Sequence, residues 1–103
     1  MPNLNKLMKQ AMKAQQQAQE IDAAMASRTV EASSGGGAVK VVATCKGQLQ
    51  SIKIDPEAVD SEDVETLEDM VRLAVNNALE EGQKIQAEEM AKVTAGMNLP
   101  GLG

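Results

Sequence analysis

The chain contains no Phe, Tyr or Trp, and this absence restricts the core that it can build. Aromatic side chains normally provide the largest single burials in a protein core, so the core here must consist of Val, Ile, Leu, Met and Ala. A length of 103 residues fits one domain spanning 1–103, and a domain of this size buries only a modest fraction of its surface. We therefore expect an obligate oligomer whose interface completes the core.

The first part of the chain, residues 1–27, is predicted to be a helix. After Pro2 it has no Gly or Pro, and it is rich in Ala, Gln, Lys, Met and Leu, which are strong helix formers. Apolar residues recur at alternating spacings of three and four, which places them on one helical face. This apolar seam consists of Leu4, Leu7, Ala11, Ala14, Ala18, Ile21 and Met25.

The same segment carries a row of lysines and no acidic residue before Glu20. Lys6, Lys9 and Lys13, called here the lysine stripe, are also spaced by three and four residues. At about 100° per residue, the stripe lies well away from the apolar seam. It is either a solvated helix face or a surface for an anionic partner, and the lysines alone do not decide between the two.

Charge is divided unevenly along the chain. The net charge is −5, yet seven basic and three acidic side chains among residues 1–53 give that half a charge of +4. The remainder therefore carries −9. Such asymmetry indicates polyanion contact by the basic half, while acidic residues gathered at the start of a later helix would also favour its dipole.

Residues 28–55 are predicted to form a sheet. Val, Ile, Ala and Cys alternate with polar residues in three runs, the pattern of half-buried strands. The runs are separated by the turn-forming sequences SSGGG and CKGQ. We expect a three-stranded antiparallel meander with one buried face. Leu49 is out of phase with Ile52 and Ile54, which indicates a β-bulge or a second contact on the outer face.

Residues 60–95 are predicted to form one long helix or two shorter ones, followed by a tail over 96–103. Asp60 or Ser61 is the expected N-cap. Met70 and Leu73 lie off the main apolar stripe, so one sheet face cannot cover both sets, and a second subunit is again expected. Gly82 either breaks the helix or allows close packing. The main stripe consists of Val64, Leu67, Val71, Ala74, Val75 and Ala78.

Several classes of chemistry lack the residues that they need. The chain has no His and a single Cys, Cys45, so catalytic triads, His-ligated metals and thiolate metal cages are excluded. The glycines at 35–37 precede a strand, whereas phosphate-binding glycines precede a helix. The carboxylates of residues 55–69 do not match a calcium loop. We expect no enzymatic activity, no cofactor, no metal and no small-molecule substrate.

The same composition bears on cellular location. One cysteine, in a run of strand-type residues, suits a reducing cytoplasm. No segment approaches the ~20 apolar residues of a membrane span, and the N-terminus lacks the apolar region of a secretory signal. We expect a cytoplasmic protein without a membrane partner.

If the anionic partner is a nucleic acid, the residues favour contact with phosphates. A helix with Lys and Gln but no Arg lacks the usual bidentate reader of guanine. Single-strand binding by stacking is disfavoured because aromatic platforms are absent. Phosphate contact and duplex shape would then dominate.

Four segments, in this order and with matching gaps, closely resemble the YbaB/EbfC family of bacterial nucleoid-associated DNA-binding proteins, over almost the whole chain. They are LMKQAMKAQQQAQE at Leu7–Glu20, GGGAVKVVATCKGQLQSIKIDPE at Gly35–Glu57, LEDMVRLAVNNA at Leu67–Ala78 and AGMNLPG at Ala95–Gly101.

The resemblance implies a homodimer in the cytoplasm and nucleoid. Its sheets would join and its helices would project like the arms of tweezers, with double-stranded DNA between or across them. The role implied is architectural or regulatory. DNA contacts would lie on the projecting helices, at Lys6, Lys9 and Lys13 and also at Lys84 and Lys92. The net acidity departs from an ideal DNA binder.

A rival hypothesis is a protein-interaction scaffold. Its helices would hold a protein partner through the apolar seam together with Leu73 and Met70, and the lysines would only keep the surface hydrated. Binding to a protein but not to duplex DNA at low salt would favour this rival.

Overall fold

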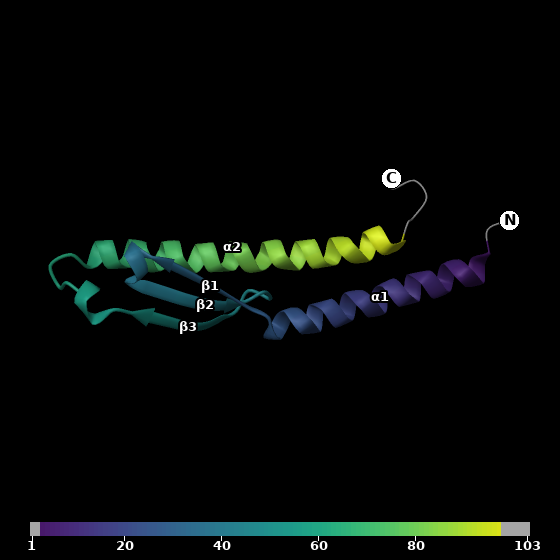
Figure 1. Cartoon of the computed structure of the whole chain (residues 1–103), viewed down its shortest axis with the longest axis horizontal. Helices are drawn as coiled ribbons and strands as arrows, with labels where there is room; N and C mark the ends of the chain where they lie inside the picture. The colour runs from purple at the N-terminus through teal and green to yellow at the C-terminus, as the bar shows by residue number, and fades with distance from the viewer. Residues whose placement is uncertain (1–2, 98–103) are drawn as a thin grey trace.

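The computed structural model describes residues 3–97 and has the α+β architecture expected from the sequence (Figure 1). Helix α1 (Leu4–Ser27) precedes three strands and a second helix, α2 (Val64–Met97). The strands are β1 (Thr29–Ser34), β2 (Val39–Thr44) and β3 (Leu49–Ile54). They form one antiparallel sheet in the order β1-β2-β3. Single 3-10 turns, Gly35–Gly37 and Pro56–Ala58, follow β1 and β3. The predicted meander is confirmed.

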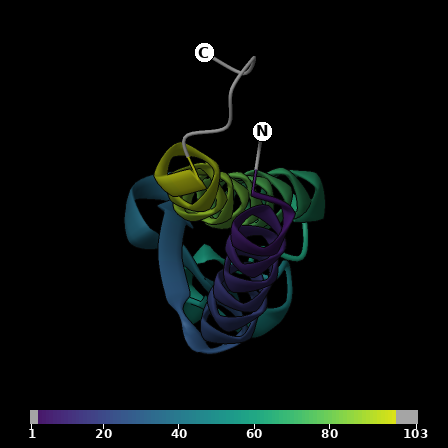
Figure 2. The ribbon, with the colours of Figure 1, turned by 90° about the vertical axis from the view of Figure 1, so that its right-hand side faces the viewer.

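The molecule is elongated, with extents of 73 × 24 × 16 Å. Figure 1 shows that α1 and the C-terminal part of α2 extend past the same end of the sheet. The end-on view of Figure 2 shows the two helices stacked one above the other. They form two projecting arms, and the first turns of α1 lie beyond the end of α2 (Figure 1).

The core lies between β2 and the first half of α2. Val39, Val41 and Ala43 alternate along β2 and are fully buried, as are Ala74 and Ala78 on α2. Partly buried side chains from β1 and α2, such as Val30 and Val71, surround this cluster. Because the central helix residues are alanines, α2 lies close to the sheet.

Helix α2 is continuous through Gly82, and this glycine marks the closest approach to the sheet. A Cβ at this position would lie 3.1 Å from both the Cα of Cys45 and the carbonyl oxygen of Thr44. Of the two roles that the sequence left open for Gly82, the structure shows close packing and not a helix break.

Strand β3 is one of the two edge strands of the sheet, and α2 packs across β1 and β2 and leaves β3 largely uncovered. Ile52 pairs with Val41 and Ile54 with Val39, so they share the apolar face of the sheet. They nevertheless remain 43% and 38% exposed, and Leu49 remains 43% exposed. The pairing shifts register between Val42 and Ala43, which confirms the β-bulge expected from the phase of Leu49.

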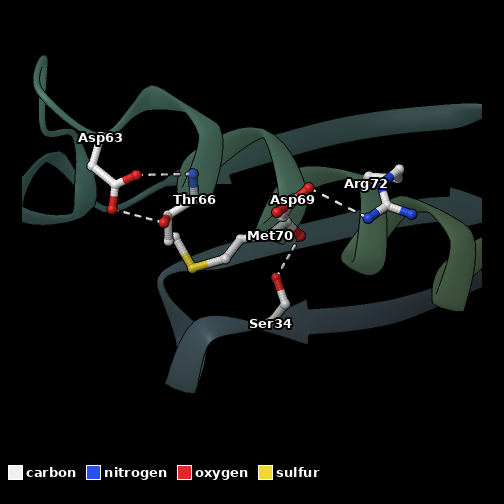
Figure 3. Close-up of polar contacts among 6 residues, drawn as sticks. All are labelled: Ser34, Asp63, Thr66, Asp69, Met70 and Arg72. Carbon is white, nitrogen blue, oxygen red and sulfur yellow. Dashed lines mark hydrogen bonds and ion pairs between the residues drawn. The ribbon is translucent and has the colours of Figure 1, made fainter.

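The start of α2 differs from the sequence-based expectation. The expected caps, Asp60 and Ser61, are wrong: the helix begins at Val64, and Asp63 caps it. The Asp63 carboxylate accepts hydrogen bonds from the backbone N–H (3.4 Å) and the hydroxyl (2.7 Å) of Thr66 (Figure 3). Asp60 instead accepts from the backbone N–H of Glu62 and shapes the preceding turn. Asp60 and Asp63 are both short acidic residues that precede the apolar run of α2, so the sequence pattern did not show which of them caps the helix.

Two further expectations on α2 also need correction. Met70 is not left uncovered: it is partly buried against the core, and its carbonyl oxygen accepts a hydrogen bond from the Ser34 hydroxyl (Figure 3). Leu73 is uncovered as expected, at 53% exposure. The predicted tail began at residue 96, whereas α2 continues to Met97. Residues 98–103 lie outside the described part of the chain.

Candidate nucleic-acid interface

The first turn of α1 holds positive charge at an unusual place for a helix. Asn3 caps the helix, its side-chain oxygen accepting a hydrogen bond from the backbone N–H of Lys6 at 3.3 Å. No acidic residue stands in this turn. Because the N-terminal end of a helix already carries a partial positive charge, Lys6 in this turn does not stabilise the helix. Its charge and the helix dipole instead add up to a positive tip that favours an anionic partner.

The lysine stripe lies on the solvent side of α1. Ala14 and Met25, which belong to the apolar seam, are buried and mark the side of the helix that faces the rest of the molecule. Lys6, Lys9 and Lys13 are exposed on the other side. None of the ion pairs found within residues 3–97 involves them. Their ammonium groups are thus available to an external anion.

A shallow depression accompanies the stripe on the surface of α1. It is lined by Lys9, Lys13, Met12 and the amide side chains of three glutamines. The structure therefore brings two of the expected DNA-binding lysines together with an exposed methionine. The sequence analysis did not assign a role to Met12. Its position four residues after Met8 is the one signal in the sequence that could have drawn attention to it.

Lys92 lies elsewhere, in a cleft of about 380 Å³ between the two helices. Ile21 and Val93 contribute apolar lining to this cleft, and Glu89 lies beside Lys92. The Lys92 ammonium donates to the Glu89 carboxylate at 2.9 Å, and Arg28 reaches the same oxygen at 3.6 Å. The hydrogen bond from Lys92 lowers the pKa of Glu89 below its usual value, and the charges of Lys92 and Arg28 lower it further.

The five expected lysines thus do not form a single group. Lys9 and Lys13 share the depression on α1, while Lys92 lies between the helices and is paired with Glu89. Lys84 is exposed on α2, about 12 Å along the helix from Lys92. Arg28, which the sequence analysis did not assign, joins Lys92 through Glu89.

Acidic residues concentrate at the opposite end of the molecule. The turn before α2 and its first turns hold Asp60, Glu62, Asp63, Glu65 and Asp69, and all are exposed. Figure 1 places the start of α2 at the far end from the α1 tip. Much of the acidic charge therefore lies away from the lysine stripe.

Within residues 3–97, no three His, Cys, Asp or Glu side chains come together in a way that could hold a metal ion. Over the same range, neither helix combines the length and the apolar character that crossing a bilayer requires.

The chain is similar to known proteins over nearly its whole length. The model of the YbaB/EbfC DNA-binding family matches residues 1–97. A nucleoid-associated protein of Moorella thermoacetica is 52% identical over 101 residues, covering 98% of this chain and 97% of its own. One of Desulforamulus reducens is 51% identical over 100 residues, covering 97% and 95%.

A solved structure adds a likeness in fold. The uncharacterized protein HP0035 from Helicobacter pylori superposes with a TM-score of 0.60 at 21% identity, covering 84% of this chain and 93% of its own. The family model and the relatives, which match over nearly the whole length, lead to one conclusion: this chain belongs to the YbaB/EbfC family of nucleoid-associated DNA-binding proteins.

Proposed function

We propose that this protein binds double-stranded DNA mainly through phosphate contacts made by the lysine stripe on α1. The observation that carries the proposal is the position of Lys6, Lys9 and Lys13: they are exposed on a projecting helix, without ion-pair partners among residues 3–97. Ammonium groups that neutralise phosphates release condensed counterions, and this release supplies affinity without regard to sequence.

The protein acts as a homodimer, joined through the edge strand β3. An edge strand offers unpaired backbone N–H and C=O groups. In β3 it also offers three half-exposed apolar side chains, Leu49, Ile52 and Ile54, which α2 leaves uncovered. A second copy that pairs with β3 satisfies these backbone groups and covers the apolar face. It also completes a core that contains no aromatic residue.

In such a dimer each copy contributes one pair of helical arms, and the duplex lies between or across them. Lys84 and Lys92 add contacts from α2, and Lys92 must exchange Glu89 for a phosphate to do so. The role is architectural or regulatory in the cytoplasmic nucleoid, without catalysis. The relatives of Moorella thermoacetica and Desulforamulus reducens, whose names place them with the nucleoid, support this location.

The test replaces Lys6, Lys9 and Lys13 together with Ala and measures duplex binding by fluorescence anisotropy on two unrelated sequences. We expect affinity to fall at least tenfold, and by a similar factor on both duplexes, because phosphate contacts carry no sequence information. A matched control replaces Lys40, Lys46 and Lys53 of the sheet region, which changes the net charge equally. Affinity that falls as far in the control as in the α1 variant would contradict the assignment to α1.

The scaffold hypothesis retains one specific observation in its favour, the 53% exposure of Leu73 on α2. Under this hypothesis the protein would capture a protein partner and would not retard duplex DNA at low salt. Replacing Leu73 with Gln would then abolish capture, while the triple lysine replacement would leave capture unchanged.

A further inference from the structure

Arg28 and Lys92 converge on one oxygen atom in the cleft between the two helices. The Lys92 ammonium lies 2.9 Å from Oε1 of Glu89, and the Arg28 guanidinium lies 3.6 Å from the same atom. The two cationic groups are therefore no farther apart than these two distances together. A single oxyanion can contact both of them, and in the structure the Glu89 carboxylate does so.

The two cations come from separate elements, and the fold fixes the backbone of each. Lys92 lies on α2. Arg28 is the one residue between α1 and β1: its N–H donates to the carbonyl oxygen of Ala24 at 3.0 Å, and its carbonyl oxygen accepts from the N–H of Cys45 at 2.9 Å. The side chains of Arg28 and Lys92 are 49% and 70% exposed, whereas that of Glu89 is 25% exposed. A ligand from solvent therefore reaches both cations.

The lysine stripe leads along α1 to this pair of cations. Gln17, Glu20 and Ala24 line the cleft from the side of α1. At about 100° per residue, these three lie within about 40° of Lys13 round the helix, so the stripe and the cleft share one face of α1. Arg28 follows Ala24 by four residues. The whole row, spaced throughout by three or four residues, consists of Lys6, Lys9, Lys13, Gln17, Glu20, Ala24 and Arg28.

A DNA strand that follows the stripe along α1 passes next to Arg28 and Lys92. Both side-chain types bind phosphate oxygens through charge-assisted hydrogen bonds. We propose that Arg28 and Lys92 form a second site for a DNA phosphate, and that Glu89 occupies this site as an internal competitor until the duplex binds. The inference rests on the proposed function. It adds Arg28 to the interface and gives Glu89 the role of lowering affinity.

The test replaces Glu89 with Gln and measures duplex binding by fluorescence anisotropy at a fixed low salt concentration. The replacement keeps the shape of the side chain and removes the charge that competes with phosphate. An exposed ion pair changes an equilibrium constant by up to about fivefold, so we expect affinity to rise by about two- to fivefold. Loss of the ion pair is expected to lower the stability of the variant, so tighter binding would not come from better folding.

Glu20→Gln is the matched control. Glu20 is exposed and lines the same cleft, and none of the ion pairs found within residues 3–97 involves it. Its replacement changes the net charge equally but uncovers no cation, so it should raise affinity by less than Glu89→Gln does. Circular dichroism at the assay temperature verifies that each variant is folded.

A second background tests whether the gain depends on the two cations. Arg28→Gln and Lys92→Gln together remove the proposed phosphate site and leave the lysine stripe in place. In this background Glu89→Gln should raise affinity no more than Glu20→Gln does, because no masked cation is left to uncover.

The outcomes separate this inference from the proposed function. Unchanged or weaker binding by a folded Glu89→Gln variant would overturn the inference and leave phosphate binding by the stripe intact. An equal rise in the Glu20→Gln control would also overturn it, as would a gain that persists without Arg28 and Lys92, because either result indicates general charge repulsion. Failure of the wild-type protein to bind duplex DNA at low salt would overturn both.

Discussion

At the scale of single residues, Glu89 shows how the fold engages one lysine of the arms in an ion pair. Its carboxylate accepts a hydrogen bond from Lys92 and lies near Arg28, so one acid links α2 to the residue that follows α1. The same contact occupies Lys92, whereas the lysine stripe on α1 has no ion-pair partner in the part of the chain that the structure describes. The two groups of lysines therefore differ in availability, although the sequence presents both as exposed helix positions.

The lowered pKa of Glu89 predicts a pH dependence of stability. Because its pKa is lower in the folded state than in the unfolded state, the ion pair stabilises the fold above the ordinary glutamate pKa of about 4.3. That contribution disappears as the pH falls through the folded-state value. We expect Glu89→Gln to lower the Tm at pH 7 and to have no effect near pH 2. Thermal melts of the wild-type protein and the Glu89→Gln variant between pH 2 and pH 7 measure the difference in Tm. A Tm difference that does not change with pH would contradict this prediction.

At the scale of secondary-structure elements, the glycine in α2 permits the contact on which the core depends. The carbonyl oxygen of Thr44 and the backbone of Cys45 lie where a side chain at Gly82 would begin. These are backbone atoms within β2 and the turn after it, so they cannot move aside as a flexible side chain does. Helix α2 is thus fixed against the end of β2 at the level where the two arms leave the sheet.

We therefore expect Gly82→Ala to destabilise the protein, although Ala gains about 1 kcal/mol of helix propensity over Gly. A net loss of about 1 kcal/mol would lower the Tm by about 4–8 °C in a domain of this size. The control is Asn76→Ala at an exposed position of α2, which should raise the Tm through propensity alone. A higher Tm for Gly82→Ala would show that the sheet moves to accept the methyl group.

The sequence predicted the elements well where one periodic pattern decides the structure. The helix predicted over residues 1–27 is observed as Leu4–Ser27, with residues 1–2 outside the described part of the chain. The alternation along β2 and the bulge near Leu49 are also present. It failed where several residues offered the same local chemistry: Asp60, Ser61 and Asp63 are all good caps, and only the path of the chain selects Asp63. Met70 lies off the main stripe of α2, but tertiary packing against the core covers it.

The candidate site was predictable to a similar extent. The lysine stripe follows from spacing alone, and the structure leaves it exposed as expected. The pairing of Lys92 with Glu89 depends on an i, i+3 contact and on Arg28 from a distant part of the chain. No pattern along the sequence shows which of two exposed lysines on α2 is engaged in this way.

At the scale of the whole molecule, the incomplete cover of the sheet predicts a dimer. Ile52 is 43% exposed on the same face as fully buried Val41. A charge at this position would be buried in the proposed interface, so we expect Ile52→Glu to give a monomer. Sedimentation velocity measures the mass in solution, and a variant that remains dimeric would place the interface elsewhere.

Lys53→Glu provides the matched control for this prediction. Lys53 neighbours Ile52 on the same strand but points to the opposite face of the sheet, because side chains alternate along a strand. The control changes the charge by more than Ile52→Glu does, yet it should leave the dimer intact. Loss of the dimer in both variants would indicate a general effect of charge and not burial of the apolar face.

Two copies of the α1 stripe are proposed to hold DNA through its phosphates, so the salt dependence of binding is the decisive measurement. Three phosphates neutralised by the stripe of each copy make about six, which contribute about −5 to the slope of log K against log salt. In the Lys6, Lys9 and Lys13 triple-alanine variant this contribution should be lost, and only the smaller slope from Lys84 and Lys92 should remain. A variant slope that stays near the wild-type value would show that the stripe does not hold the phosphates.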